Sequence, residues 1–185
     1  DIKKYPVCYA SHTAVDGVKE LLYLNNINSS NIKKIICTVP PVVASNLTFP
    51  EPSNPTEAQF SLEFAIATII QHGSLDLTHL EDDFIRSPSL KNISKRVFMD
   101  IGVLPKGKIY NKNICPEWAQ VEIMTNDGGH YKTFVGSPEG SAMRPLPEKL
   151  LYKKFTECLV YAGTDRNAEK LYEKLRNIDQ MSTPD

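Results

Sequence analysis

The sequence of 185 residues has no long apolar run and almost no net charge. No apolar stretch reaches the roughly 18 residues that cross a membrane, and the opening DIKKYP lacks the basic-then-apolar order of a signal peptide. The 21 basic residues are balanced by 22 acidic ones, so the chain lacks the excess of positive charge that is typical of nucleic-acid-binding proteins. We therefore expect a cytoplasmic protein without a nucleic-acid or membrane partner.

The four cysteines are scattered and form no C-x-x-C pair; they are Cys8, Cys37, Cys115 and Cys158. A zinc site needs ligand pairs close in sequence, and a disulfide framework is typical of shorter secreted chains. The phosphate-binding patterns G-x-x-x-x-G-K-[ST] and G-x-G-x-x-G do not occur. We expect reduced thiols and no metal site.

The first half of the chain predicts a helix, a strand, a loop and a second helix. Apolar residues recur at helical spacing from Ser11, the expected N-cap, to about Leu24. The β-branched run 33–39 predicts a strand, and five prolines between Pro40 and Pro55 predict a loop. Residues 56–73 open with the capping box TEAQ and are apolar on nearly every face. They predict one long, buried, central helix.

The second half predicts a hairpin among further helices. AQVEIMT and HYKTFV alternate on either side of the turn NDGG, which is typical of a β-hairpin over 119–135. Two short helices are expected over 77–97, a strand near 96–101, and two helices after Pro147. Strands separated irregularly by helices predict a single α+β domain over residues 1–185, with a small antiparallel sheet packed against helices.

Lys4 and His12 lie close to the start of the first predicted helix. Backbone N–H groups and the dipole at a helix start favour an anion, so this pair predicts a carboxylate-binding corner. The alternative is a solvated lysine beside a capping or core histidine. Cys8 and His12 could also form a nucleophile and its base, although a lone cysteine is more often a small buried apolar side chain. Residue spacing alone leaves these alternatives open.

Several motifs follow one another in a distinctive order. K-x-Y-P-x-C-x-x-x-H begins at Lys3 or Lys4 and ends at His12. HTAVDGV, NPTEAQFSLEFAIATIIQHG, VEIMTNDGGHY and GSPEGSAMRPLPEKLLYKKF come after it. Over roughly residues 3–160 the order resembles the C-terminal domain of the 2-methylcitrate dehydratase family, also called MmgE/PrpD.

The resemblance implies the smaller, α+β, C-terminal domain of a two-domain protein. An all-helical N-terminal domain would precede it and supply the other wall of the active site, so the chain is expected to be a fragment that is inactive alone. The family needs no cofactor or metal. Its members dehydrate, decarboxylate or epimerise small di- and tricarboxylates, so the implied reaction is proton abstraction next to a carboxylate.

The resemblance also implies site residues. Lys4 and His12 are expected to be catalytic, through carboxylate binding, charge stabilisation and, for His12, proton transfer. The residues expected to contact substrate are Lys4, Tyr5, Cys8, His12 and Phe64. Phe64 departs from the family, whose signature helix commonly carries tyrosine at this position, and a phenyl ring cannot donate a hydrogen bond. The rival hypothesis is therefore a binding or interaction module that kept the fold and lost its acid–base groups. A homodimer is a further expected association.

Overall fold

The computed structural model describes residues 1–108, 116–164 and 167–180. The chain divides into two units, Asp1–Pro145 and Leu146–Asp185. The predicted single domain over residues 1–185 stays a prediction. Cys115 lies outside the described residues, and Cys8, Cys37 and Cys158 are free thiols. No helix among the described residues has the length and apolar character needed to cross a membrane.

The first unit is built on a four-stranded sheet in the order β2-β1-β3-β4. The strands are β1 (Ile32–Val39), β2 (Val97–Ile101), β3 (Ala119–Thr125) and β4 (His130–Val135). β3 pairs antiparallel with both β1 and β4, whereas β2 runs parallel to β1. The α+β prediction is confirmed, with a mostly antiparallel sheet.

The predicted hairpin over 119–135 is confirmed, with its turn at NDGG. Met124 of β3 lies opposite His130 of β4, and the Thr125 N–H donates to the Gly129 carbonyl at 2.9 Å. Gly128 adopts φ 89°, a left-handed conformation that glycine adopts without steric cost. The glycine at position 128 therefore lets the NDGG sequence form this turn without backbone strain.

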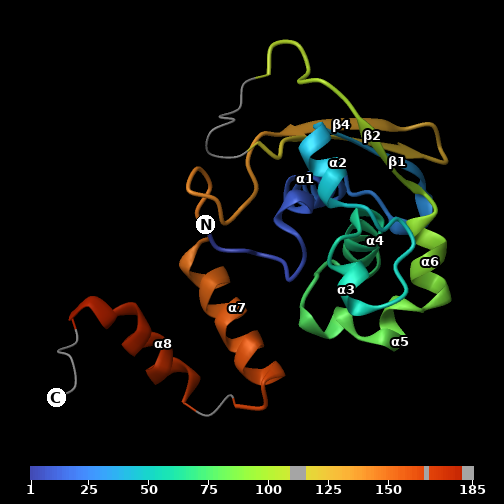
Figure 1. Ribbon diagram of the computed structural model, residues 1–185. Coiled ribbons are helices and arrows are strands. Elements are labelled where there is room, and N and C mark those ends of the chain that lie inside the picture. The colour runs from blue at the N-terminus through green and yellow to red at the C-terminus, as the bar shows by residue number, and fades with distance from the viewer. Residues whose placement is uncertain (109–115, 165–166, 181–185) are drawn as a thin grey trace. The chain divides into compact units, whose positions relative to one another are not determined.

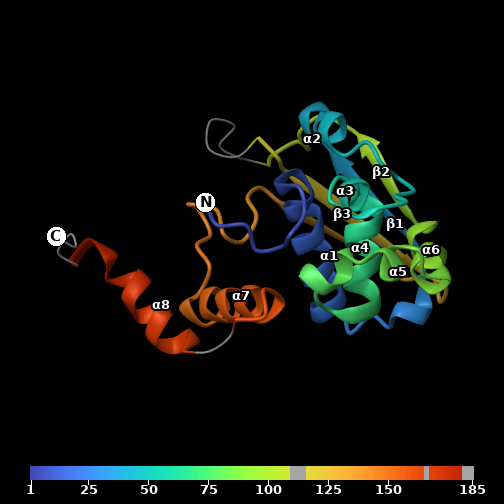
Figure 2. The same cartoon turned by 60° about the horizontal axis from the view of Figure 1, so that its bottom comes forward.

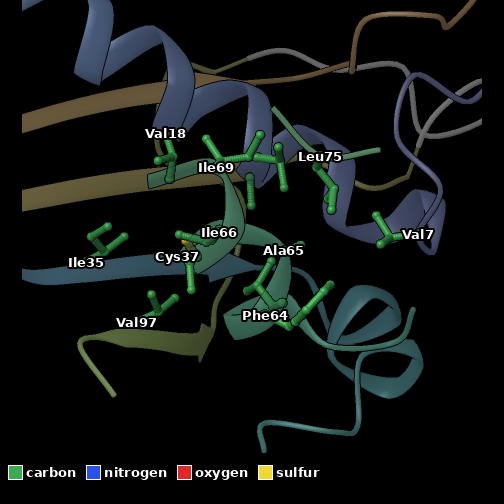
Figure 3. Packing of buried hydrophobic residues seen from close by; sticks show 14 of the residues in the cluster. Val7, Val18, Ile35, Cys37, Phe64, Ala65, Ile66, Ile69, Leu75 and Val97 are labelled. Atoms are coloured by element: carbon green, nitrogen blue, oxygen red, sulfur yellow. The ribbon is translucent and has the colours of Figure 1, made fainter. Parts of the chain in front are cut away.

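Helices α1 (His12–Leu24) and α4 (Leu62–His72) pack on the same face of the sheet (Figures 1 and 2). α1 contacts β3 and β4, and α4 contacts α1, β2 and α6 (Pro88–Ser94). Every residue of α4 from Leu62 to Ile70 is buried, which confirms that the predicted helix is buried over this part of its length. Figure 3 shows its Ile66 and Ile69 among side chains from α1, β1 and β2.

The predicted long helix over 56–73 is instead two helices, α3 (Pro55–Ala58) and α4. Between them, the Gln59 carbonyl accepts from the Cys8 N–H at 2.7 Å and the Phe60 carbonyl accepts from the Phe49 N–H. These carbonyls bond to other segments rather than along a helix, so the helix is interrupted. It restarts at Ser61, whose Oγ accepts from the Phe64 N–H at 3.1 Å.

The predicted loop between Pro40 and Pro55 is partly wrong, because it contains the short helix α2 (Pro41–Asn46). Pro41 occupies the first helical position, where a backbone N–H would have no partner within the helix, so proline loses nothing by lacking one. Val43 of the same helix is fully buried. The predicted short helices of residues 77–97 are η3 (Leu77–Leu80), α5 (Asp82–Ile85) and α6.

The second unit contains α7 (Glu148–Tyr161) and α8 (Ala168–Arg176). The two helices contact each other through aromatic rings, with 4.9 Å between the ring centroids of Tyr152 and Tyr172. The Tyr172 hydroxyl also donates to Glu148 Oε1 at 2.7 Å. Both predicted C-terminal helices are therefore present.

Candidate functional site

The N-terminal segment is held in place by its own buried side chains. Tyr5 and Val7 are buried, and the Ser11 hydroxyl donates to the Cys8 carbonyl at 2.9 Å just before α1 begins. The Cys8 N–H bond to the Gln59 carbonyl ties the segment to the start of α4. The motif around Lys4 therefore has a defined position next to two helix starts.

Asp16 is the centre of a polar cluster at the first turns of α1. Its side chain is only 5% exposed, and its Oδ1 accepts from the Tyr5 hydroxyl at 2.9 Å and from Lys4 Nζ at 3.2 Å. Its Oδ2 accepts from the Glu139 backbone N–H at 2.7 Å. These donors compensate the loss of water that burying a carboxylate entails.

Glu139 and Arg144 complete the cluster from the loop at residues 136–145. The Glu139 carboxylate forms an ion pair with Lys4 and lies 3.7 Å from Arg144 Nη2. Arg144 Nη1 lies 4.0 Å from Asp16 Oδ2 and donates to the Ser137 carbonyl at 2.9 Å. Two cations, Lys4 and Arg144, thus face two carboxylates.

The cluster shifts the protonation of two of its members. Partial burial alone would raise the pKa of Glu139, but the hydrogen bond from Lys4 and the charges of Lys4 and Arg144 outweigh it and lower that pKa below its usual range. Burial, reinforced by the Asp16 carboxylate, raises the pKa of the Tyr5 phenol. Glu139 is therefore an anion at neutral pH, and Tyr5 is a neutral donor.

His12 packs against the rings of Tyr5 and Tyr9. Its side chain is fully buried, with its ring centroid 5.1 Å from that of Tyr5 and 5.0 Å from that of Tyr9. Lys4 Nζ lies 5.0 Å from the centre of the same Tyr5 ring. The structure thus brings Lys4, Tyr5 and His12 together, with the His12 side chain fully buried.

The other two predicted contact residues have different surroundings. Cys8 is half-buried beside Gln59, through the backbone bond already described. Phe64, labelled in Figure 3, is buried in the first turn of α4, and its ring centroid lies 6.3 Å from that of Phe84. Phe64 borders a separate cavity that also contacts α6 and β2.

Sequence reasoning missed Asp16, Glu139 and Arg144. Asp16 follows His12 by four positions, which places both on one helical face, and a charged residue between buried Val15 and Val18 is a signal that could have found it. Glu139 and Arg144 have no such signal, because their loop reaches the cluster only in the folded chain. Among the described residues, no group of three or more His, Cys, Asp or Glu side chains is placed to hold a metal ion.

The family model described as the MmgE/PrpD C-terminal domain matches residues 5–180 of the chain. The matched segment includes Tyr5, His12, Asp16, Glu139 and Arg144, and it begins one position after Lys4. A search of curated proteins finds no match to the chain. Because the family model spans nearly the whole sequence and the fold is the α+β arrangement that its motifs predict, the chain belongs to the MmgE/PrpD C-terminal domain family.

Proposed function

We propose that this chain is the C-terminal part of a cofactor-independent lyase that removes a proton next to a carboxylate of a small di- or tricarboxylate. Membership of a dehydratase-like family supports the reaction class. The observation that carries the substrate class is the cluster around Lys4, in which two cations already hold the carboxylate of Glu139.

A substrate carboxylate would replace the carboxylate of Glu139. The Glu139 side chain is about one-third exposed at 33%, so it can move aside while Asp16 keeps Lys4 in position. Arg144 offers a planar donor group that suits a second carboxylate oxygen. The hydrogen bond that the Tyr5 hydroxyl donates to Asp16 Oδ1 keeps the Asp16 carboxylate in position.

The chemical step would develop negative charge on the substrate near Lys4. A base takes the proton from the carbon next to the carboxylate, the electron pair forms the carbon–carbon double bond, and the hydroxyl takes up a proton and leaves as water. Lys4 stabilises the enolate-like charge during this step. The base is expected to belong to the helical N-terminal domain that the family resemblance implies, so residues 1–185 alone would be inactive.

The rival function is a binding module without catalysis. It is supported by Phe64, which has no hydroxyl to donate, and by the pairing of Lys4 with two carboxylates. An epimerase or a decarboxylase of the same family remains an alternative outcome, since epimerisation also begins with proton removal.

The first measurement is the size of the native polypeptide, by immunoblot of its source with an antibody to this chain. A band more than twice the 20.8 kDa of the chain supports a second domain in the same polypeptide. A band near 20.8 kDa favours the binding module, unless a separate subunit supplies the other wall.

The second measurement is proton exchange into a panel of citrate-like substrates in heavy water, with the native polypeptide. Exchange supports the lyase, and no exchange across the panel supports the binding module. Lys4→Met should abolish exchange, whereas the matched variant Lys3→Met, at an exposed neighbouring lysine, should leave it intact. If Lys3→Met abolishes exchange and Lys4→Met does not, the assignment of Lys4 is wrong.

A further inference from the structure

A cavity of about 570 Å³ lies between α4, α6, β2 and the loop at residues 50–53. Its volume is in the range of small-molecule sites. Apolar side chains form the inner walls: Phe64, Ile85, Leu90 and Val97. Residues 97–100 of β2 line it in succession, and β2 is the outermost strand, so the cavity follows an edge of the sheet.

This cavity is separate from the cluster around Asp16. Its lining includes none of Lys4, Asp16, Glu139 and Arg144, and Phe64 is the member of the predicted site that borders it. The β2–α6 side of the first unit is therefore a second place at which a small molecule could bind, independent of the proposed lyase function.

Glu63 is the buried polar group of this cavity. The residue is 8% exposed and lies in the first turn of α4, where the helix start favours a negative charge. Burial nevertheless raises the pKa of its carboxyl, and the hydrogen bonds from Ser61 and from its own backbone N–H only reduce that effect. Within the described part of the chain, no basic side chain forms an ion pair with it. A positively charged ligand could supply the ion-pair partner that this buried carboxylate lacks.

The other charged lining residues are exposed. Glu51 and Asp100 are acids, and the bases are Lys91 on α6 and Lys95 directly after it. Exposed lysines are well hydrated and give little binding energy for an anion. The exposed acids Glu51 and Asp100 are discounted for the same reason, so the buried Glu63 is the charged group that matters inside the cavity, and it favours a cation there.

We propose that this cavity binds a small organic amine, whose protonated amino group pairs with Glu63 and whose apolar body packs against Phe64, Leu90 and Val97. The arrangement supplies the cation that Glu63 lacks and fills an apolar space of about 570 Å³. An amine of aromatic or branched aliphatic type matches these walls.

The test compares three probes of the same shape and different charge. The full chain is titrated with 2-phenylethylamine, 2-phenylethanol and phenylacetate, and binding is followed by the amide NMR signals of residues 63–64 and 97–100. The amine should bind at least about tenfold more tightly than the alcohol, because it adds a charged hydrogen bond in a buried site. Phenylacetate should bind most weakly.

Two variants and a control make the assignment specific. Glu63→Gln keeps the shape of the side chain and should weaken the amine about tenfold while leaving the alcohol unchanged. The matched control Glu51→Gln, at an exposed acid of the same cavity, should change the amine affinity less than about threefold. Ser94→Phe, which fills the cavity from α6, should abolish binding of both probes.

Three results would overturn the proposal. If the amine and the alcohol bind with equal affinity, Glu63 does not contribute to binding. If phenylacetate binds most tightly, the exposed lysines Lys91 and Lys95 determine the specificity of the cavity instead. Full amine affinity in the Ser94→Phe variant places the probe outside the cavity.

Discussion

Tyr5→Phe removes one hydroxyl from the buried side of the Asp16 cluster. The hydroxyl donates to Asp16 Oδ1 at 2.9 Å, and Tyr5 is 3% exposed. Phenylalanine keeps the ring in place, so the variant loses a hydrogen bond without opening a cavity. Because the acceptor is a carboxylate, the expected loss in the free energy of unfolding is about 1.5–3 kcal/mol.

The loss should lie at the lower end of that range, because other donors still bind the Asp16 carboxylate. After the substitution, Asp16 still accepts from Lys4 Nζ at 3.2 Å and from the Glu139 N–H at 2.7 Å. The carboxylate is therefore not left without partners, and we expect a loss of about 1.5 kcal/mol. In the Asp16→Asn background the cost of Tyr5→Phe should fall, since the hydroxyl then bonds to a neutral oxygen.

The assay is urea unfolding followed by the fluorescence of Trp118, which is 2% exposed and belongs to the first unit. It is the single tryptophan of the chain, so the signal reports unfolding of residues 1–145. The urea concentration at the midpoint of unfolding should fall, while the dependence of the free energy of unfolding on urea concentration stays constant.

Tyr131→Phe is the matched control, because that hydroxyl makes no hydrogen bond to a described residue. It should change the free energy of unfolding by less than about 0.5 kcal/mol. Equal effects of Tyr5→Phe and Tyr131→Phe would refute the role given to Asp16.

Three further predictions concern α4 and α1. Because burial raises the pKa of Glu63 above its ordinary 4.5, the acid costs stability as the pH rises through that raised value. Glu63→Gln should therefore be more stable than the parent at neutral pH and equal to it below about pH 4.5, and urea titrations that show the gap growing in acid would contradict this. Ser61→Ala should cost about 1 kcal/mol in the same assay, because it removes the side-chain cap on the Phe64 N–H, whereas Ser61→Thr should retain most of the stability. Gly17→Val should cost about 1–3 kcal/mol, since a Cβ at Gly17 would lie 2.8 Å from Val121 Cγ2, and unchanged unfolding would disprove that close helix–sheet contact.

Much of the fold could be predicted where a local pattern has one physical outcome. The β-branched run of β1, the NDGG turn and the apolar length of α4 each specify an element without reference to the rest of the chain. The family motifs likewise direct attention to Lys4, Tyr5 and His12, which the structure brings together.

Tertiary contacts decided the features that sequence patterns missed. The break between α3 and α4 depends on Cys8 and Phe49, whose N–H groups bind the carbonyls of residues 59 and 60. The ion pair between Lys4 and Glu139 joins positions 135 apart, and the backbone N–H of Glu139 reaches Asp16 over 123 positions. Periodicity and turn chemistry act over a few residues, so the sequence alone determined most elements of this protein, its family and the motif that carries Lys4, Tyr5 and His12. The cluster around Asp16 was decided only by folding, because the loop at residues 136–145 meets the start of α1 through contacts that no local pattern encodes.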